Sequence, residues 1–190
     1  RILKSVKPGR KTCHDCDVAN IQRRAREPAS NKSIPDVRSG WSLDLFDMRD
    51  IVSIGGHRYV FVFVCWKSRY VHVELGSKKS DALEALKSAC ARFGHCPREL
   101  RSDNAPEFFD ERFSRYCKDN RINHVSSAPY TQHQNGLAES RVNEINRMLR
   151  VLMRQSALPL DFWGYCIQYC CFLQNHTPCS TTGRIPIIEQ

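Results

Sequence analysis

The chain has 190 residues, of which 41% are hydrophobic and 26% are charged, which is ordinary for one globular domain and excludes a disordered or collagen-like chain. Its longest apolar run, YVFVFVCW at residues 59–66, is too short to cross a bilayer, and we find no signal peptide, so we expect no membrane partner. The formal net charge is +9, which favours a polyanionic partner.

The positive charge is concentrated in the first 40 residues, which hold ten basic and four acidic side chains. This segment is polar and has no lasting apolar period, so we predict a basic linker at 1–40 before a folded domain at 41–190. A basic arm favours nucleic acid as the partner, and a solubilising tail is the alternative. Because the chain begins with Arg1 rather than Met, we expect it to be part of a longer protein.

Ten cysteines in a chain of this length raise the question of a secreted disulfide scaffold. Most of them lie inside apolar runs, where a free thiol behaves as a small hydrophobic group. Together with the missing signal peptide, this favours a reducing compartment, the cytosol or the nucleus.

The first half of the predicted domain has strand patterns. WSLDLFDM at residues 41–48 alternates, with Trp41, Leu43 and Leu45 on one side and Asp44 on the other. Residues 59–66 form a buried strand after the Gly55-Gly56 turn, and RYVHVEL at 69–75 alternates again. These three segments predict an antiparallel meander.

The second half alternates helices and short strands. We predict helices at 80–94, 106–120, 137–155 and 161–174, and short strands in RELRS at 98–102 and INHVSS at 122–127. In the predicted helix at 106–120, Phe109, Phe113 and Tyr116 stand at helical spacing. This order of elements indicates an α/β fold with a mixed sheet and helices packed on it.

Three carboxylates stand where a stable fold gains little from them. Asp44 lies inside a strand, Asp103 follows the RELRS strand, and Glu139 begins the long helix. If the first and fourth strands pair, Asp44 and Asp103 project from one sheet edge, and the helix could bring Glu139 alongside. Taken singly, each also has an ordinary role, as a half-exposed strand residue, a turn former or a first-turn helix acid.

Clustered carboxylates raise one another's pKa unless a cation is present. Oxygen ligands suit hard cations, so we predict two Mg²⁺ or Mn²⁺ ions at Asp44, Asp103 and Glu139. Two such ions about 4 Å apart would act on the attacking and the leaving oxygen of a phosphodiester.

Three segments resemble the catalytic segments of retroviral-type integrase cores: SLDLFDM from residue 42, LRSDNAPEF from residue 100 and APYTQHQNGLAESRVNEINRML from residue 128. The 35 residues between Asp103 and Glu139 match the acid spacing of that superfamily. The chain is most similar to the copia-like retrotransposon integrases, because LPLDFWGYCIQYCCFLQNHTP at 158–178 also fits their pattern. The resemblance extends over about residues 12–190.

The resemblance implies an RNase H-like fold, with a mixed five-stranded sheet of three antiparallel strands plus parallel strands, flanked by helices. It also implies that Asp44, Asp103 and Glu139 are the catalytic, metal-binding triad. Other positions match family residues beside the second acid or in a loop close to DNA: Asn104, Glu107, Gln134, Asn135 and Gly136.

The chain departs from the usual family pattern at Ala105, His133 and Ser140, none of which is an expected metal ligand. The basic residues Arg147 and Arg150 share one face of the long helix with Arg154, and we predict that they contact DNA. A solvated helix surface is the alternative for these arginines.

A half of a zinc module is suggested by CHDC, in which Cys13 and Cys16 have metal-ligand spacing. Integrases of this family carry a His-His-Cys-Cys module before the core, but residues 1–12 contain no His. We therefore expect Zn²⁺ only if the module is complete in the full-length protein. Two thiols in a tail, without zinc, are the better expectation for this chain alone.

The function that the resemblance implies is that of the integrase catalytic domain of a retrotransposon polyprotein. Such a polynucleotidyl transferase joins element DNA ends to target DNA, can trim 3′ ends, and works as a homo-oligomer in the nucleus and cytoplasm. Two alternatives remain: a domesticated integrase that binds nucleic acid without cutting it, and a plain RNase H-like nuclease.

Overall fold

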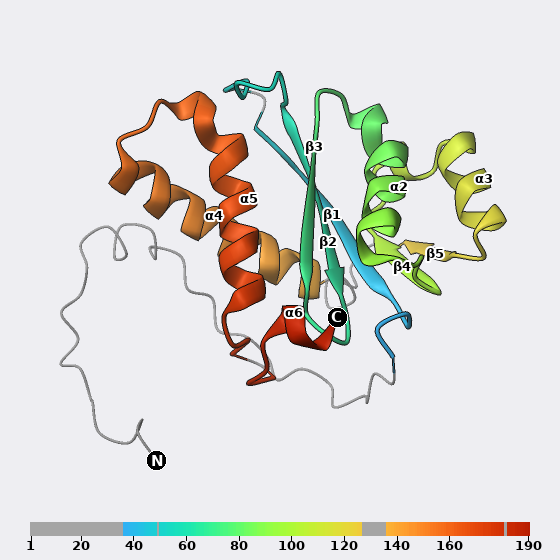
Figure 1. Cartoon of the computed structure of the whole chain (residues 1–190). Helices are drawn as coiled ribbons and strands as arrows, with labels where there is room; N and C mark the ends of the chain where they lie inside the picture. Colours follow the sequence, from blue (N-terminus) through green and yellow to red (C-terminus); the bar gives the residue numbers. More distant parts are fainter. Residues whose placement is uncertain (1–35, 49, 127–135, 181) are drawn as a thin grey trace, which may run out of the picture.

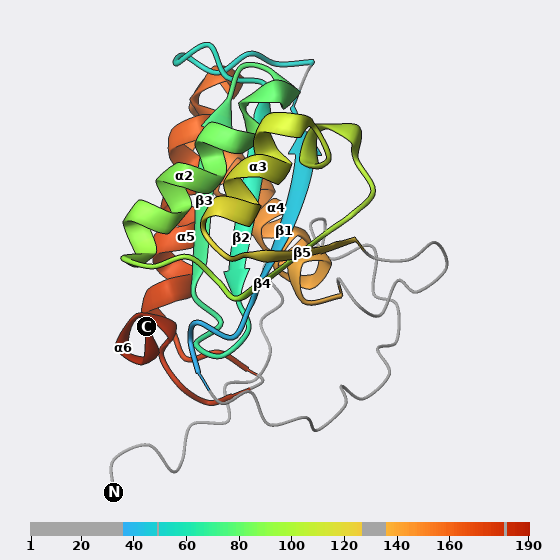
Figure 2. The same cartoon turned by 90° about the vertical axis from the view of Figure 1, so that its right-hand side faces the viewer.

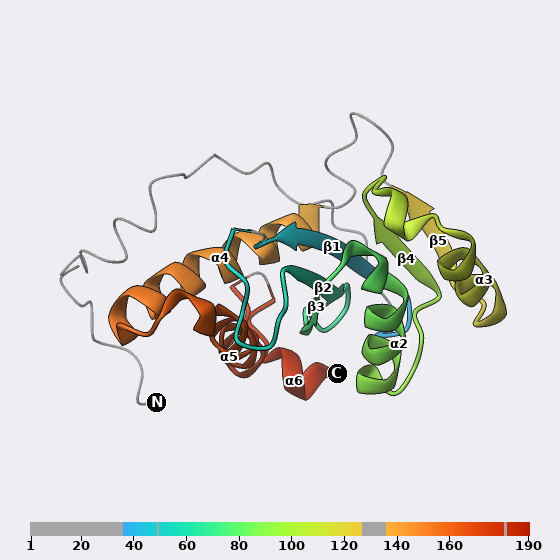
Figure 3. The same cartoon turned by 90° about the horizontal axis from the view of Figure 1, so that it is seen from above.

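The computed structural model describes residues 36–48, 50–126, 136–180 and 182–190 as a mixed sheet between two layers of helices (Figures 1 and 3). The basic linker up to residue 35, with Cys13 and Cys16, lies outside the described residues. Within the described ranges, no helix combines the length and the apolar character that a membrane crossing needs. The elements, labelled as in Figure 1, are β1 (Trp41–Asp47), β2 (Tyr59–Cys65), β3 (Val71–Gly76), η1 (Lys79–Asp81), α2 (Ala82–Phe93), β4 (Glu99–Ser102), η2 (Pro106–Phe108), α3 (Glu111–Asp119), β5 (Asn123–Ser126), α4 (Gly136–Ser156), η4 (Leu160–Phe162), α5 (Trp163–His176) and α6 (Pro186–Glu189).

The five strands are ordered β3-β2-β1-β4-β5. Strands β1, β2 and β3 form the predicted antiparallel meander, and β4 and β5 continue the sheet in parallel with β1. The predicted mixed five-stranded sheet is therefore confirmed. Strand β1 lies at its centre, between an antiparallel neighbour and a parallel one.

The alternation in β1 separates two cores. Trp41 and Leu43 are fully buried on the face covered by α2 and α3. Phe46, on the opposite face, packs into the core beneath α4 and α5. Figure 2 looks onto the layer of α2 and α3, with α4 and α5 behind the sheet. Asp44 has the same parity as Phe46, so it belongs to the α4 face.

The predicted helix over 106–120 is divided in two, which corrects the sequence-based expectation. A 3₁₀ turn covers Pro106–Phe108, and α3 starts afresh after Asp110, whose carboxylate accepts a hydrogen bond from the backbone N–H of Phe113 at 2.6 Å. This N-cap gives α3 its own beginning. Phe109 falls in the break and is 45% exposed, so it does not belong to a buried helical stripe.

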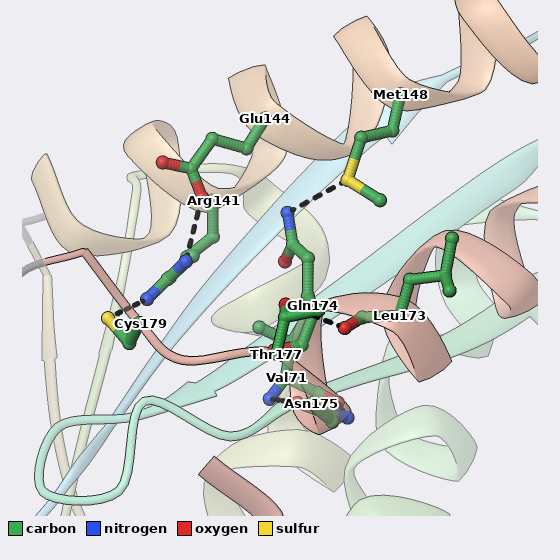
Figure 4. Close-up of polar contacts among 9 residues, drawn as sticks. All are labelled: Val71, Arg141, Glu144, Met148, Leu173, Gln174, Asn175, Thr177 and Cys179. Atoms are coloured by element: carbon green, nitrogen blue, oxygen red, sulfur yellow. Dashed lines mark hydrogen bonds and ion pairs between the residues drawn. The ribbon is translucent and has the colours of Figure 1, made fainter. Parts of the chain in front are cut away.

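Helix α5 is fixed to the outer strand of the sheet by one buried side chain. The amide of Asn175, 4% exposed, accepts from the backbone N–H of Val71 at 2.8 Å and donates to the carbonyl of Val71 at 2.7 Å (Figure 4). Asn175 thereby takes the place of a neighbouring strand at the edge of β3. This contact holds α5 against the sheet, beside α4.

Candidate active site

Asp44 lies in the middle of the central strand. Its side chain is half-buried on the α4 face, and its Oδ1 accepts a hydrogen bond from the backbone N–H of Leu45 at 2.9 Å. Its backbone is paired with Val62 of β2, while the ladder with β4 ends two residues earlier, at Ser42. Asp44 therefore lies beside the carboxyl end of β4, on a strand that the sheet holds in place.

Asp103 directly follows β4, the parallel neighbour of β1. The register pairs Ser42 with Arg101, and continuing it by two residues brings Asp103 opposite Asp44. This pairing was the condition on which the sequence-based prediction depended, and it is confirmed. The Asp103 side chain is exposed, and its Oδ1 accepts from the backbone N–H of Ala105 at 3.2 Å.

Glu139 lies in the first turn of α4 and is exposed. Helix α4 packs on the same face of the sheet that carries Asp44, through Val142, Ile145 and Leu149. The first turn of a helix is favourable for a carboxylate, because the helix dipole places partial positive charge there. The third acid thus comes from a different layer of the fold than the other two.

Electrostatics connects the three acids. The pKa of the Asp44 carboxyl is raised from its ordinary value of 3.8 to about 6. Burial is the largest cause, and the Leu45 N–H acts in the opposite direction, while the negative charges of Asp103 and Glu139 raise the pKa further. The structure therefore brings all three carboxylates close enough to interact, although 35 and 58 residues separate them along the chain.

The donor chemistry fits a hard divalent cation, because the three side chains offer only oxygen and the half-buried Asp44 carries a negative charge that a cation would neutralise. Across residues 36–48, 50–126, 136–180 and 182–190, no three or more His, Cys, Asp or Glu side chains form a ready-made group that could hold a metal ion. The acids thus interact through their charges without making a closed ligand set.

The start of α4 is anchored by Arg141, which lies two residues after Glu139 and is only 9% exposed. Its guanidinium donates to Glu144 Oε2 at 2.7 Å and to the Sγ of Cys179 at 2.7 Å (Figure 4). Cys179 belongs to the turn between α5 and α6. The contact with Cys179 ties the first turns of α4 to the segment between α5 and α6.

The other predicted site residues have different outcomes. Asn104 is exposed next to Asp103, and Arg147 and Arg150 are exposed on α4. Gly136 is the first residue of α4. Four predicted residues lie outside the described part of the chain: Cys13, Cys16, Gln134 and Asn135.

Two groups that hold the acids were not found from the sequence. The backbone N–H groups of Leu45 and Ala105 bind the carboxylates of Asp44 and Asp103, and no residue type indicates such a role. For Asp103, the sequence analysis gave a turn former as an alternative role, and this Asx-type contact to a residue two positions later agrees with it.

Comparison with known proteins agrees with this geometry. The model of the family described as "Integrase core domain" matches residues 36–132. The chain is 28% identical over 172 residues to the retrovirus-related Pol polyprotein from transposon TNT 1-94 of Nicotiana tabacum, covering 88% of this chain and 13% of that protein. It is 26% identical over 189 residues to the Pol polyprotein from transposon RE1 of Arabidopsis thaliana, covering 93% and 12%. The chain therefore spans only about an eighth of these relatives.

Solved structures share the fold. The simian T-cell lymphotropic virus intasome, solved in complex with PP2A regulatory subunit B56 gamma, superimposes with a TM-score of 0.70 at 21% identity, over 94% of this chain and 63% of that one. The HTLV-2 integrase catalytic core domain in complex with magnesium gives 0.62 at 20% identity, over 80% and 95%. The RNase H-like expectation is thereby confirmed. With its family match, its sheet order and its three interacting acids, the chain belongs to the integrase core domain family of retrotransposon and retroviral Pol polyproteins.

Proposed function

We propose that this chain is the catalytic core of a retrotransposon integrase and that it joins element DNA ends to target DNA by metal-dependent strand transfer. The observation that carries the proposal is the electrostatic interaction of Asp44 with Asp103 and Glu139. These acids come from β1, the end of β4 and the start of α4, so the fold, and not local sequence, brings them together. A DNA 3′-hydroxyl is the nucleophile for joining, and water is the nucleophile for trimming a 3′ end.

Asp44, Asp103 and Glu139 would hold two Mg²⁺ or Mn²⁺ ions. Bound there, the ions would supply stabilisation of the charge on the attacking and the leaving oxygen. The HTLV-2 core domain, which has this fold, was solved in complex with magnesium. The chain itself contributes position: Asp44 is fixed by the central strand and the N–H of Leu45, and Asp103 by the N–H of Ala105.

DNA is proposed to lie along the face that carries the acids. Asn104 is exposed beside Asp103, and Arg147 and Arg150 are exposed further along α4. By resemblance, Gln134, Asn135 and Gly136 form the loop that contacts DNA. Arginines bind phosphates without regard to base identity, so we expect insertion to be weakly sequence-specific.

We propose a homo-oligomer as the functional form. Helix α5 exposes a row of aromatic side chains at helical spacing, with Tyr165 60%, Tyr169 51% and Phe172 53% exposed. An apolar row of this size on a helix is typical of a protein contact. The HTLV-2 core was solved in trimeric and dimeric forms. Light scattering on Tyr169→Ser with Phe172→Ser should give a smaller mass than wild type at equal concentration.

A reducing compartment, nucleus and cytoplasm, is proposed from the state of the thiols. The eight cysteines in the described residues are not in disulfides, and six of them are buried. Burial raises the pKa of Cys117 and Cys170 to about 12, which keeps both thiols protonated and unreactive at neutral pH.

The test is a strand-joining assay with a labelled DNA end and the full-length integrase that contains this chain. Three single variants, Asp44→Asn, Asp103→Asn and Glu139→Gln, should each abolish joining, and double variants should be no worse, because the acids act as one unit. DNA binding should survive in all of them. Glu111→Gln is the matched control, since Glu111 is an exposed acid on α3.

The same assay separates the alternatives. If the Glu139→Gln variant joined DNA ends as fast as the wild type, the integrase mechanism would be refuted. A wild-type protein that binds DNA but neither joins nor cuts it would be a binding module. Cleavage of the RNA strand of an RNA–DNA hybrid without joining would identify an RNase H-like nuclease.

A further inference from the structure

Two polar side chains, Ser102 and His124, lie next to Asp103 on the paired strands β4 and β5. Ser102, the last residue of β4, is 0% exposed, and His124 is half-buried on the neighbouring strand β5. The Oγ of Ser102 lies 2.9 Å from the Nε2 of His124 and 2.9 Å from the backbone carbonyl oxygen of Asp103. A continuous chain of hydrogen bonds thus runs from β5 to the residue proposed to bind metal.

The direction of these hydrogen bonds follows from proton count. A hydroxyl has one proton, and that of Ser102 is donated to the carbonyl oxygen of Asp103. With that proton committed, the same Oγ can accept a hydrogen bond from the Nε2–H tautomer of His124. Burial lowers the pKa of His124 and so favours a neutral ring, which can present an Nε2–H to the Oγ of Ser102.

Two aromatic rings hold the imidazole in place. The ring of Phe109 is stacked on His124, with centroids 4.8 Å apart and planes inclined by 26°. Phe113 contacts it at a centroid distance of 5.3 Å. Phe109 is 45% exposed and does not belong to a buried helical stripe, but one face of its ring covers His124.

This arrangement matters because the pairing of β4 with β5 ends at Ser102. Asp103 is the first residue beyond that ladder, and its side chain turns back to the N–H of Ala105. The carbonyl of Asp103 is bound by Ser102, which fixes the peptide plane that follows the Asp103 Cα. Fixing that plane restricts the backbone rotation at Asp103 and thereby the positions open to its carboxylate.

We propose that His124 is a positioning residue for Asp103 and that it acts through the hydroxyl of Ser102. The proposal rests on the proposed function for the consequence of misplacing Asp103. Partners of this kind, which touch a metal ligand and not the metal, typically change metal affinity or activity by about 10- to 100-fold when they are removed.

A matched pair of variants tests the hydrogen bond separately from the ring. The amide nitrogen of His124→Gln can take the place of Nε2, whereas that of His124→Asn reaches only the place of Nδ1. Ser102→Ala removes the hydroxyl that links His124 to the carbonyl oxygen of Asp103, and these three variants are called the relay variants. For each variant, calorimetry gives the affinity of the chain for Mn²⁺, a melting curve gives folding, and single-turnover joining by the full-length protein gives the rate and the DNA concentration at half-maximal rate.

We expect His124→Asn and Ser102→Ala to lower Mn²⁺ affinity and the joining rate about 10-fold or more, with the half-maximal DNA concentration unchanged. His124→Gln should stay much closer to wild type. Equal losses in the Gln and Asn variants would overturn the proposal, because the ring would then act only by packing. Wild-type Mn²⁺ affinity in folded Ser102→Ala would overturn it as well.

Two outcomes separate a failure of the proposed function from a failure of the positioning role of His124. If wild type binds Mn²⁺ but joins no DNA, the proposed function is wrong, and the Mn²⁺ affinities alone decide the role of His124. If Asp103→Asn abolishes joining while the three relay variants join normally, the function stands and the positioning role is refuted.

Discussion

The raised pKa of Asp44 has a measurable cost in folding stability. In the unfolded chain this carboxyl titrates near 3.8, and in the folded chain near 6. The folded state therefore holds the proton more tightly, so ionisation destabilises the fold. The cost is absent well below pH 3.8, grows between pH 4 and 6, and is complete above about pH 6. A difference between 3.8 and about 6 corresponds to about 3 kcal/mol.

The perturbation is Asp44→Asn, which removes the charge and keeps an oxygen that can accept from the N–H of Leu45. Urea unfolding in EDTA at pH 4 and pH 7 gives the free energy of unfolding of both chains. We expect the variant to exceed wild type by about 3 kcal/mol at pH 7 and by less than about 1 kcal/mol at pH 4. Asp119→Asn, at an exposed position on α3, is the control and should show no such growth with pH.

A stability difference that does not change with pH, or a variant less stable than wild type at pH 7, would contradict this expectation. Either outcome would mean that Asp44 is held by favourable contacts and not destabilised by burial and like charge. Mn²⁺ gives an independent check. A cation requires the ionised carboxylate, so Mn²⁺ affinity of the wild type should fall as the pH drops below about 6.

Three further results are expected. Asp103→Asn should melt at or above the wild-type temperature without metal, because it relieves repulsion with Asp44, and its Mn²⁺ affinity should be greatly reduced in calorimetry. Arg147→Ala with Arg150→Ala should weaken DNA binding and lower the steepness of log affinity against log salt by about 2. The control, Arg112→Ala with Arg115→Ala on α3 in the opposite layer, should change neither. Asn175→Ala should lose about 2 to 4 kcal/mol in urea unfolding, because it leaves both backbone groups of Val71 unpaired, while the exposed Gln168→Ala on the same helix should be neutral.

Much of the sheet and of the candidate site could be predicted because the relevant signal is local. The alternation around Asp44 predicts a strand with two different faces, and both faces are found as expected. The short strand before Asp103 could be placed from its flanking turn residues. The pairing of β1 with β4 was only a condition of the sequence-based prediction, and the structure supplies it, which brings the two acids to the same edge.

The features that escaped prediction depend on competition or on distant partners. The apolar spacing favoured one helix through Phe109. The structure starts α3 after Asp110 instead, because the N-cap hydrogen bond of Asp110 stabilises a helix that begins there. The contact between Arg141 and Cys179 joins residues 38 positions apart, and nothing near either residue indicates the other. The role of His124 similarly depends on a neighbour in another strand.

The order of the strands also has a consequence for how the chain folds. Strands β1, β2 and β3 follow one another and pair with their sequence neighbours, so this half of the sheet needs only short loops to close. The junction of β1 with β4 must wait for a much longer loop, and the first turn of α4 joins from further still. Loop closure of that length is entropically slower. We therefore expect the meander to be protected first in pulsed hydrogen exchange, and the edge that carries the acids to be the last part of the fold to form.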